Sequence, residues 1–389
     1  MNAQPLYDLT PLAHIAALGI ALATGPLAWL WLRHRHAEPA ARLRALTLLT
    51  LFLTFDLVLV GAFTRLTDSG LGCPDWPGCY GSASPVGAQA AIHAAQTAMP
   101  SGPVTHSKAW IEMVHRYFAA GIGVLSAMLM VLSWIETRRR RAAISPWWAT
   151  ATFVWVGVQG AFGALTVTMK LYPAIVTTHL LLGLGLMAML AAQAQAYRPQ
   201  PLVLPRALVV GSVAVFALCV LQIALGGWVS TNYAVLACSD FPQCQGSWWP
   251  AMDFAHGFAL VRALGVGQGG EMLPFAALTA IHMAHRVGAL LLFSAIGLLA
   301  WRLSLGDSAQ RRWALALAGV AAWQFASGLS NVVLGWPLVA AMAHTGGAAV
   351  LLSLLTVLLV RVHQARQRAE PLASPMRGAA TMSSLSSPS

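Results

Sequence analysis

Charged residues are scarce in this sequence of 389 residues. Asp, Glu, Lys and Arg make up only 9% of it, whereas 58% is hydrophobic. A soluble globular domain carries about 25% charged residues, so the composition excludes an ordinary soluble globule. The wealth of apolar residues also excludes a disordered chain. The sequence contains neither a P-loop nor a Rossmann fingerprint, the phosphate-binding motifs of many nucleotide enzymes.

Long apolar runs, in contrast, are frequent. A helix needs about 20 apolar residues to cross a bilayer, and nine runs meet this length. They cover residues 12–32, 44–63, 110–134, 147–167, 174–195, 207–227, 278–301, 313–334 and 338–360. Short segments of alternating polarity, which a membrane barrel would need, do not occur. The runs predict an all-α polytopic membrane protein with nine spans.

The basic residues are sorted between alternate loops. With 23 Lys and Arg against 12 Asp and Glu, the net charge is +11, which on its own would fit a nucleic acid partner. All but six of these basic residues, however, lie on one side of the predicted membrane. The six exceptions are Arg65, Lys108, Arg116, Lys170, Arg262 and Arg286. By the positive-inside rule, we expect a bacterial inner-membrane protein with its N-terminus outside and its C-terminus in the cytoplasm, and no nucleic acid partner.

The second half of the sequence repeats the first. Residues 61–81 (GAFTRLTDSGLGCPDWPGCYG) match residues 226–246 (GGWVSTNYAVLACSDFPQCQG) at an offset of 165. Residues 110–116 (WIEMVHR) match residues 280–286 (AIHMAHR) at an offset of 170. Spans two to five therefore correspond to spans six to nine. Because four spans is an even number, both copies cross the membrane in the same direction, which predicts a parallel repeat about an axis along the membrane normal.

The repeat divides the chain into four parts. Residues 1–43 hold an extra transmembrane helix and a basic cytoplasmic loop, and residues 44–196 and 197–361 form two pseudo-symmetric four-helix bundles. Residues 362–389 are expected to be a disordered cytoplasmic tail, because its end is rich in Ser, Pro and Ala. Residues 248–273, in the long loop of the second bundle, are expected to form a short amphipathic helix.

Four of the histidines inside predicted spans lie in pairs at matching depths near the outer surface. His115 and His179 belong to the first bundle, and His285 and His344 belong to the second. Ionisable residues inside a membrane are rare and typically functional. Two imidazoles on different helices of a four-helix bundle suit the axial positions of a haem, which predicts one haem site in each bundle. The alternative is that each histidine only forms a hydrogen bond with a neighbouring helix.

One position beside these histidines differs between the halves. Glu112 stands three residues before His115, on the same helix face, whereas His282 stands three residues before His285. A site that moves protons needs such a carboxylate, and a site that only transfers electrons does not. Two alternatives stay open: Glu112 could pair with Arg116 one turn later, and His282 could take the axial role in place of His285.

Arg116 and Arg286 directly follow the first histidine of each pair. A guanidinium in this place could hold a haem propionate through charge-assisted hydrogen bonds. It could equally be an anchor that extends to the polar surface of the membrane.

Four of the five cysteines lie in outside loops. Close spacing and an oxidising compartment predict the disulfides Cys73–Cys79 and Cys238–Cys244. Each disulfide either pins a loop over its bundle or exchanges electrons, since a disulfide in a short exposed loop can be labile. The fifth cysteine, Cys219, falls within a span and is expected to be a packing residue.

Taken together, the motifs resemble the haem A synthase family. The resemblance rests on EMVHR at 112–116, TTH at 177–179, AIHMAHR at 280–286, AHTGGA at 343–348 and the paired cysteine loops. It covers residues 44–361, the whole duplicated core. The extra first span and the outside N-terminus depart from the eight-span members of the family.

The resemblance implies an oxidoreductase that acts on a CH or CH₃ group. The family oxidises the methyl group at carbon 8 of haem O to a formyl group, which yields haem A for terminal oxidases. His285 and His344 match the axial ligands of a retained haem b, near which Arg286 and His282 lie. His115 and His179, with Arg116 beside them, match the half in which the substrate haem O binds. Glu112 matches a carboxylate that the family needs for activity.

The same interpretation names partners. Besides haem O and haem A, we expect an electron donor, either a quinol or a redox protein, together with membrane lipid. Haem O synthase, oxidase assembly factors and a second copy of the chain are further partners that it allows.

Two other functions fit part of the pattern. A di-haem b-type electron-transfer cytochrome that oxidises quinol would explain the four histidines but not the difference between Glu112 and His282. A haem-binding transporter would release haem unchanged, but transporters usually bind their cargo near the midplane of the membrane, whereas these histidines lie near one face.

Overall fold

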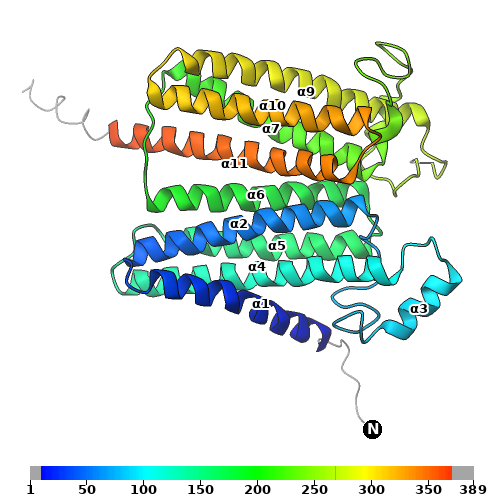
Figure 1. The fold of residues 1–389 in the computed structure, drawn as a ribbon, viewed down its shortest axis with the longest axis horizontal. Coiled ribbons are helices and arrows are strands. Elements are labelled where there is room, and N and C mark those ends of the chain that lie inside the picture. The colour runs from blue at the N-terminus through cyan, green and yellow to red at the C-terminus, as the bar shows by residue number, and fades with distance from the viewer. Residues whose placement is uncertain (1–9, 268, 370–389) are drawn as a thin grey trace, which may run out of the picture.

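The computed structural model describes residues 10–267 and 269–369. Its long helices run side by side (Figure 1). Within this part of the chain, nine helices are long and apolar enough to cross a membrane, which confirms the predicted all-α polytopic fold. They are α1 (Thr10–His34), α2 (Pro39–Leu66), α4 (His106–Arg138), α5 (Trp147–Thr168), α6 (Pro173–Tyr197), α7 (Arg206–Thr231), α9 (Phe275–Ser304), α10 (Ser308–Val333) and α11 (Leu338–Ala369). The loops add three short helices, α3 (Gln89–Ala98), the 3₁₀-helix η1 (Ala234–Ala237) and α8 (Phe254–Gly257).

Local sequence signals set several helix starts. Pro173 occupies the first turn of α6, where a missing N–H costs no hydrogen bond. The side chain of Thr105 caps α4 by accepting a hydrogen bond from Lys108 N at 3.2 Å. Asp307 caps α10 in the same way through Gln310 N at 2.8 Å. The starts of two histidine-bearing helices, α4 and α6, are therefore encoded in the residues at those positions.

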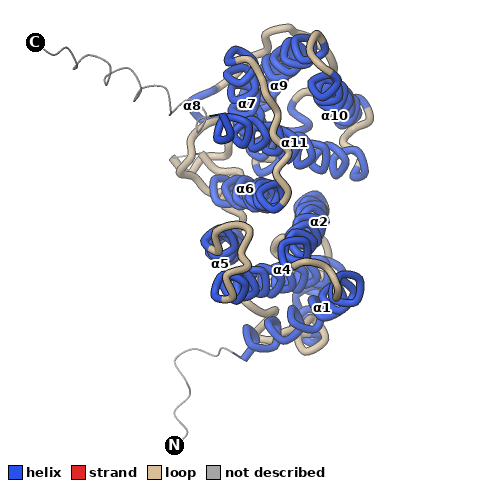
Figure 2. Tube along the Cα trace, turned by 90° about the vertical axis from the view of Figure 1, so that its left-hand side faces the viewer, coloured by secondary structure: helices blue, strands red, loops and turns tan. Residues whose placement is uncertain are grey.

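Eight of the long helices form two rings of four. In the first ring α2 packs against α4, α4 against α5, α5 against α6, and α6 against α2. In the second ring α7, α9, α10 and α11 follow the same cyclic order. Helix α1 lies outside the first ring, against α4 and α2 (Figure 2). Helices α4 and α6 thus stand at opposite corners of the first ring, and α9 and α11 at opposite corners of the second.

The two rings meet in a symmetric way. The contacts between them join α6 to α11, α6 to α7, and α11 to α2, and in the repeat α6 corresponds to α11 and α2 to α7. At one end of the helices, the Tyr233 hydroxyl donates to Oδ1 of Asp68, its own counterpart in the repeat, at 2.6 Å. At the other end, Arg361 Nε donates to Gln195 Oε1 at 3.3 Å. A residue touches its counterpart only near a twofold axis, so the contact of Tyr233 with Asp68 fits the expected parallel repeat.

The two ends of the helices carry different loops. The end at the right in Figure 1, which we call the cysteine end, carries the long loops 67–105 and 232–274. The opposite end, which we call the arginine end, carries the short connections 139–146 and 198–205 and the end of α11.

The apolar core fills each ring toward the arginine end. In the first ring it includes Leu129 and Leu190, and in the second Leu303 and Leu355. Cys219 belongs to the core of the second ring, in agreement with its predicted packing role. The level between this core and the cysteine-end loops is where the four histidines lie.

The last helix is longer than the final apolar run. Helix α11 continues to Ala369, past residue 360 and into the segment that was expected to be disordered. Arg366 and Arg368 lie in its last turn, where positive charge interacts favourably with the helix dipole. The rest of the expected tail, residues 370–389, lies outside the described residues.

The expected amphipathic helix over residues 248–273 is wrong. Among the described residues of this range, only Phe254–Gly257 is helical. Glycine accounts for the difference, because Gly265 and Gly270 adopt left-handed φ values of +75° and +89°, which a helix does not contain.

Candidate functional site

The four predicted histidines form two pairs, one inside each ring. His115 lies on α4 and His179 on α6, and His285 and His344 lie on α9 and α11. Each pair therefore comes from helices at opposite corners of its ring. All four histidines are half-buried, although their helices pack into the rings.

A glycine on a neighbouring helix faces each of these histidines. A Cβ atom added at any of the four glycines would lie 3.0–3.2 Å from Cε1 of the imidazole, which is closer than almost all real Cβ contacts. The four pairs are Gly61–His115, Gly163–His179, Gly226–His285 and Gly328–His344. The glycines come from the two corners of each ring that carry no histidine. They give the edge of each imidazole the room to lie against the backbone of the next helix.

The second histidine of each pair has the same backbone contact. Gln159 Nε2 donates to the carbonyl oxygen of His179 at 3.0 Å, and Gln324 Nε2 donates to that of His344 at 3.0 Å. The two glutamines are counterparts in the repeat, so this contact belongs to the shared scaffold.

The ring nitrogens of the histidines differ between the halves. In the second ring, Gln222 Nε2 lies 2.9 Å from Nδ1 of His285, and Ser327 Oγ lies 3.1 Å from Nδ1 of His344. In the first ring, Nδ1 of both histidines is buried and has no hydrogen-bond partner among the described residues. The repeat is therefore broken at the groups that contact the imidazoles.

Glu112 is buried, with 3% of its surface exposed, and both its oxygens have partners. Oε2 accepts a hydrogen bond from Cys73 N at 2.8 Å, and Oε1 accepts one from Arg116 Nη2 in an ion pair. The pairing with Arg116 that the sequence left open is thus present. The contact with Cys73 ties the carboxylate to the first disulfide loop.

His282 fills the matching position in the second ring and is also buried. Its Nδ1 lies 2.9 Å from the carbonyl oxygen of Ala234 in η1 and donates to it. The glycine of α7, Gly226, faces His285, as its counterpart faces His115. The structure therefore groups His285, and not His282, with the other three glycine-facing histidines.

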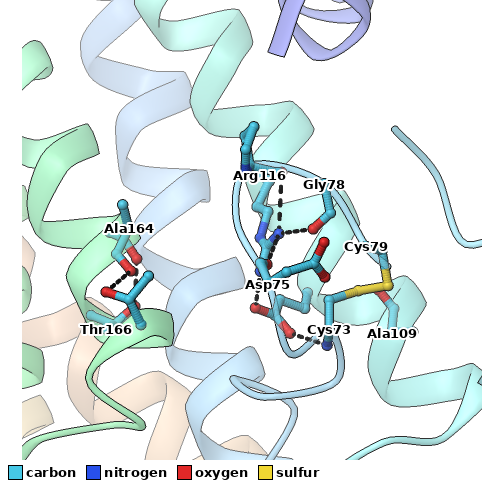
Figure 3. A network of polar contacts seen from close by, with 12 residues as sticks. Cys73, Asp75, Gly78, Cys79, Ala109, Arg116, Ala164 and Thr166 are labelled. Atoms are coloured by element: carbon cyan, nitrogen blue, oxygen red, sulfur yellow. Dashed lines mark hydrogen bonds and ion pairs between the residues drawn. A yellow bond between two sulfur atoms is a disulfide. The ribbon is translucent and has the colours of Figure 1, made fainter. Parts of the chain in front are cut away.

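Arg116 and Arg286 hold the two disulfide loops. Arg116 Nη1 donates to the carbonyl oxygens of Asp75 at 3.0 Å and Gly78 (Figure 3). Arg286 donates to the carbonyl oxygens of Gln243 and Asp240, each at 2.8 Å. Neither interpretation of the sequence, propionate binding or surface anchoring, included this contact with the loops.

The disulfides Cys73–Cys79 and Cys238–Cys244 are both present, as predicted. An aspartate organises the turn beyond each one. Asp240 accepts hydrogen bonds from the N–H groups of Gln245 at 2.7 Å and Gly246 at 2.9 Å, and Asp75 accepts the equivalent pair in the first loop. The backbone N–H of Gly246, followed by that of Gln245, holds the pKa of the Asp240 carboxyl below its usual range.

Sequence reasoning missed six residues that contact the imidazole rings of the histidines. The four glycines follow the repeat offset of 165, so a search for repeated small residues opposite the histidines would have found them. Gln222 and Ser327 break the repeat, and only their polarity within a span marks them.

The residues present fit a haem with two axial imidazoles. Each ring supplies two imidazoles from opposite corners, and each imidazole is seated on a glycine. Haem iron takes nitrogen ligands of this kind. Within residues 10–267 and 269–369, no three His, Cys, Asp or Glu side chains gather to hold a bare metal ion.

Fold and site together define a polytopic membrane protein, built from a duplicated four-helix ring, with an imidazole pair in each ring. Residues 44–356 match the COX15-CtaA family, described as cytochrome oxidase assembly protein. Heme A synthase of Shewanella oneidensis is 38% identical over 314 residues, which cover 80% of this chain and 93% of that protein. Heme A synthase of Caulobacter sp. strain K31 is 29% identical over 335 residues, with 80% and 93% covered. The chain belongs to the haem A synthase family.

Proposed function

We propose that this protein oxidises the C8 methyl group of haem O to the formyl group of haem A, as an oxidoreductase acting on a CH or CH₃ group. The observation that carries the proposal is a difference within a repeated site. Each ring has an imidazole pair, and only the first ring has a carboxylate, Glu112, on the helix of its first histidine. Relatives named heme A synthase support the same reaction.

In this proposal the second ring would hold a resident haem b, and His285 and His344 would bind its iron. When bound, this haem supplies electron transfer. The residues around it fix the ligands: the amide of Gln222 and the hydroxyl of Ser327 contact the two imidazoles. Arg286 and His282 act less directly, because they hold the second disulfide loop and η1 against the ring.

The first ring binds the substrate haem O in this proposal, with His115 and His179 as the iron-binding residues. Arg116 fixes Glu112 and the first disulfide loop together. Glu112 lies one turn from His115 on α4, so its carboxylate is close to the iron-binding side of the ring. We assign to it either the uptake of a proton from the reacting group or the stabilisation of positive charge that develops there.

The methyl group of haem O is converted in two successive hydroxylations of the same carbon, followed by loss of water. Conversion of a methyl to a formyl group removes four electrons from the substrate. Dioxygen is the oxidant in this scheme: each hydroxylation inserts one oxygen atom of O₂ into a C–H bond and releases the other as water, with two protons and two electrons. The electrons would come from a quinol or a redox protein and reach the first ring through the second.

We further propose that the cysteine end faces the outside of a bacterial inner membrane and that the arginine end faces the cytoplasm. Disulfides persist in an oxidising compartment, and basic loops stay on the cytoplasmic side. Haem O carries a farnesyl tail, so it would reach the first ring through the lipid, supplied by haem O synthase.

The test is co-expression of the full chain with a source of haem O in a host that makes no haem A. Extracted pigments are then separated by chromatography. We expect haem A to appear only when the protein is present. An unmodified haem O pool together with a redox-active purified protein would indicate an electron-transfer cytochrome. Stoichiometric release of unmodified haem O would indicate a transporter, and either result would contradict the proposal.

A further inference from the structure

Ser327 occupies a defined position next to His344. It lies on α10, directly before the glycine that faces this histidine, and 8% of its surface is exposed. Its Oγ is 2.8 Å from the carbonyl oxygen of Trp323, 3.3 Å from that of Gln324 and 3.1 Å from Nδ1 of His344. The hydroxyl therefore lies within hydrogen-bond distance of two backbone acceptors and one imidazole nitrogen.

The single proton of this hydroxyl decides which nitrogen of His344 carries a hydrogen. A serine hydroxyl donates one hydrogen bond and accepts others through its lone pairs. The Trp323 carbonyl can only accept, and it lies one turn earlier on the helix, so the hydroxyl proton goes to it. Nδ1 of His344 must then be the donor. The lone pair of the imidazole is left on Nε2, the nitrogen through which histidine binds a metal when Nδ1–H is hydrogen-bonded.

The first ring gives His179 no such acceptor. The counterpart of Ser327 is Phe162, whose side chain has no oxygen or nitrogen. Nδ1 of His179 is buried, and no described residue forms a hydrogen bond with it. Its tautomer is therefore not fixed by a neighbour.

The other histidine of each ring also differs in its polar neighbour. The side-chain NH₂ group of Gln222 lies 2.9 Å from Nδ1 of His285, whereas its counterpart in the first ring is the apolar Leu57. Nδ1 of His115 is buried, like that of His179, and lacks a partner among the described residues. Both imidazoles of the second ring thus have a polar neighbour at Nδ1, and both imidazoles of the first lack one.

We propose that Ser327 is a positioning residue that fixes His344 in the Nδ1–H tautomer. This contact makes the second ring retain its haem, whereas the first ring, which has Phe162 at the same position, releases its haem. The inference rests on the proposed function, in which the second haem is resident and the first is substrate. A hydrogen bond from Nδ1–H makes Nε2 a stronger base, and such partners change metal affinity by about 10–100-fold. A resident haem needs the stronger binding, and a haem that leaves as product needs the weaker one.

The test compares the purified full-length Ser327→Ala and Ser330→Ala variants. Ser330 is a matched control, since it lies one turn further along α10 and its hydroxyl donates to the Ala326 carbonyl at 2.7 Å. We expect Ser327→Ala to retain haem b at least about 10-fold less tightly against apomyoglobin and to show a higher haem midpoint potential. Ser330→Ala should match the wild type, and Ser327→Thr, which keeps a hydroxyl, should restore both properties. Equal retention and equal potentials in all four proteins would overturn the proposal.

The reverse variant, Phe162→Ser, gives His179 the missing acceptor and remains informative even if Ser327→Ala does not fold. With added haem b as the probe, we expect the first ring of this variant to release haem several-fold more slowly than the wild type, and an unchanged rate would count against the proposal. A wild-type protein without resident haem b would instead refute the proposed function. A wild type that holds haem b and forms haem A, combined with an unaffected Ser327→Ala, would refute only the role of Ser327.

Discussion

The first and second rings share their packing but not their polar groups. The glycines that face the histidines, the glutamines on α5 and α10 and the aspartates in the disulfide turns occur in both. The groups that differ are Glu112 against His282 and the apolar pair Leu57 and Phe162 against Gln222 and Ser327. The duplicated scaffold is therefore kept where the helices must fit together. It is changed next to the imidazoles, where the two sites need different chemistry.

The position of Glu112 and His282 shows the change most directly. In the first ring an acceptor at this position takes a hydrogen bond from the Cys73 N–H. In the second ring a donor at this position gives one to the Ala234 carbonyl. Both side chains bind the cysteine end to the ring, but only one of them can carry a negative charge.

The largest effect is expected from Glu112→Gln. Glutamine keeps an oxygen that can accept the hydrogen bond from Cys73 N–H, but it cannot take up a proton, so haem A formation should fall by about 100-fold or more. The control is His282→Gln at the matching position, for which we expect a clearly smaller loss. Haem A per protein, measured by pigment extraction, checks both variants, and equal losses would remove the distinction between the rings.

The next largest effect should separate the two disulfides. Only the first disulfide loop contacts Glu112, through a hydrogen bond from Cys73 N–H to Glu112 Oε2. A hydrogen bond to a charged group is worth about 1.5–3 kcal/mol, so replacing both cysteines of the first pair by serine should lower haem A formation about 10-fold. The same change in the second pair should cost much less activity. An equal loss of haem A formation after replacement of the second pair would contradict this expectation and would indicate a redox role shared by both loops.

A smaller effect is expected where the imidazoles meet glycine. In Gly328→Ala the new Cβ would lie 3.0 Å from Cε1 of His344, and in Gly163→Ala 3.2 Å from Cε1 of His179. Each imidazole must then move by a few tenths of an ångström. We expect Gly328→Ala to alter the absorption spectrum of the purified protein and Gly163→Ala to raise the KM for haem O several-fold without altering that spectrum.

The same helices offer matched controls for these two variants. A Cβ at Gly319 on α10 or Gly157 on α5 would meet nothing within 4 Å. Gly319→Ala and Gly157→Ala should therefore leave spectrum and KM unchanged. Controls that behave like the test variants would show that helix stiffness, and not the imidazole contact, is responsible.

The smallest effect concerns the seam between the rings. Tyr233→Phe removes the hydroxyl that donates to Asp68 but keeps the aromatic ring over which Arg65 lies, 4.1 Å from its centroid. The free energy of unfolding should fall by about 0.5 kcal/mol, the low end of the range for one hydrogen bond. Thermal unfolding in detergent measures this change, and a loss of several kcal/mol would mean that the seam carries much more of the stability.

Much of the fold could be predicted from the sequence because membranes impose simple rules. A span needs a long apolar run, so the nine helices are visible directly, and the repeat places His115 with His285 and His179 with His344. Both disulfides could be predicted as well, because the two cysteines of each pair are close in sequence within one outside loop.

The rest depended on contacts between distant segments. Arg116 contacts the carbonyls of Asp75 and Gly78 only because the first loop folds back over α4, and no local pattern encodes that path. The contact of Ser327 with His344 depends on how α10 and α11 are rotated against each other. Residues 248–273 were misread because apolar and aromatic residues suggested a surface helix, while their glycines favour a loop.

The central claim is that the second ring holds a resident haem b and the first ring does not. The most direct measurement is the haem b content of the purified full chain in two variants at counterpart positions, His344→Ala and His179→Ala, determined from reduced-minus-oxidised spectra and extracted pigment. We expect His344→Ala to lose the haem b and His179→Ala to retain it. Haem b retained in His344→Ala, or lost in His179→Ala, would show that the second ring is not the site of the resident haem.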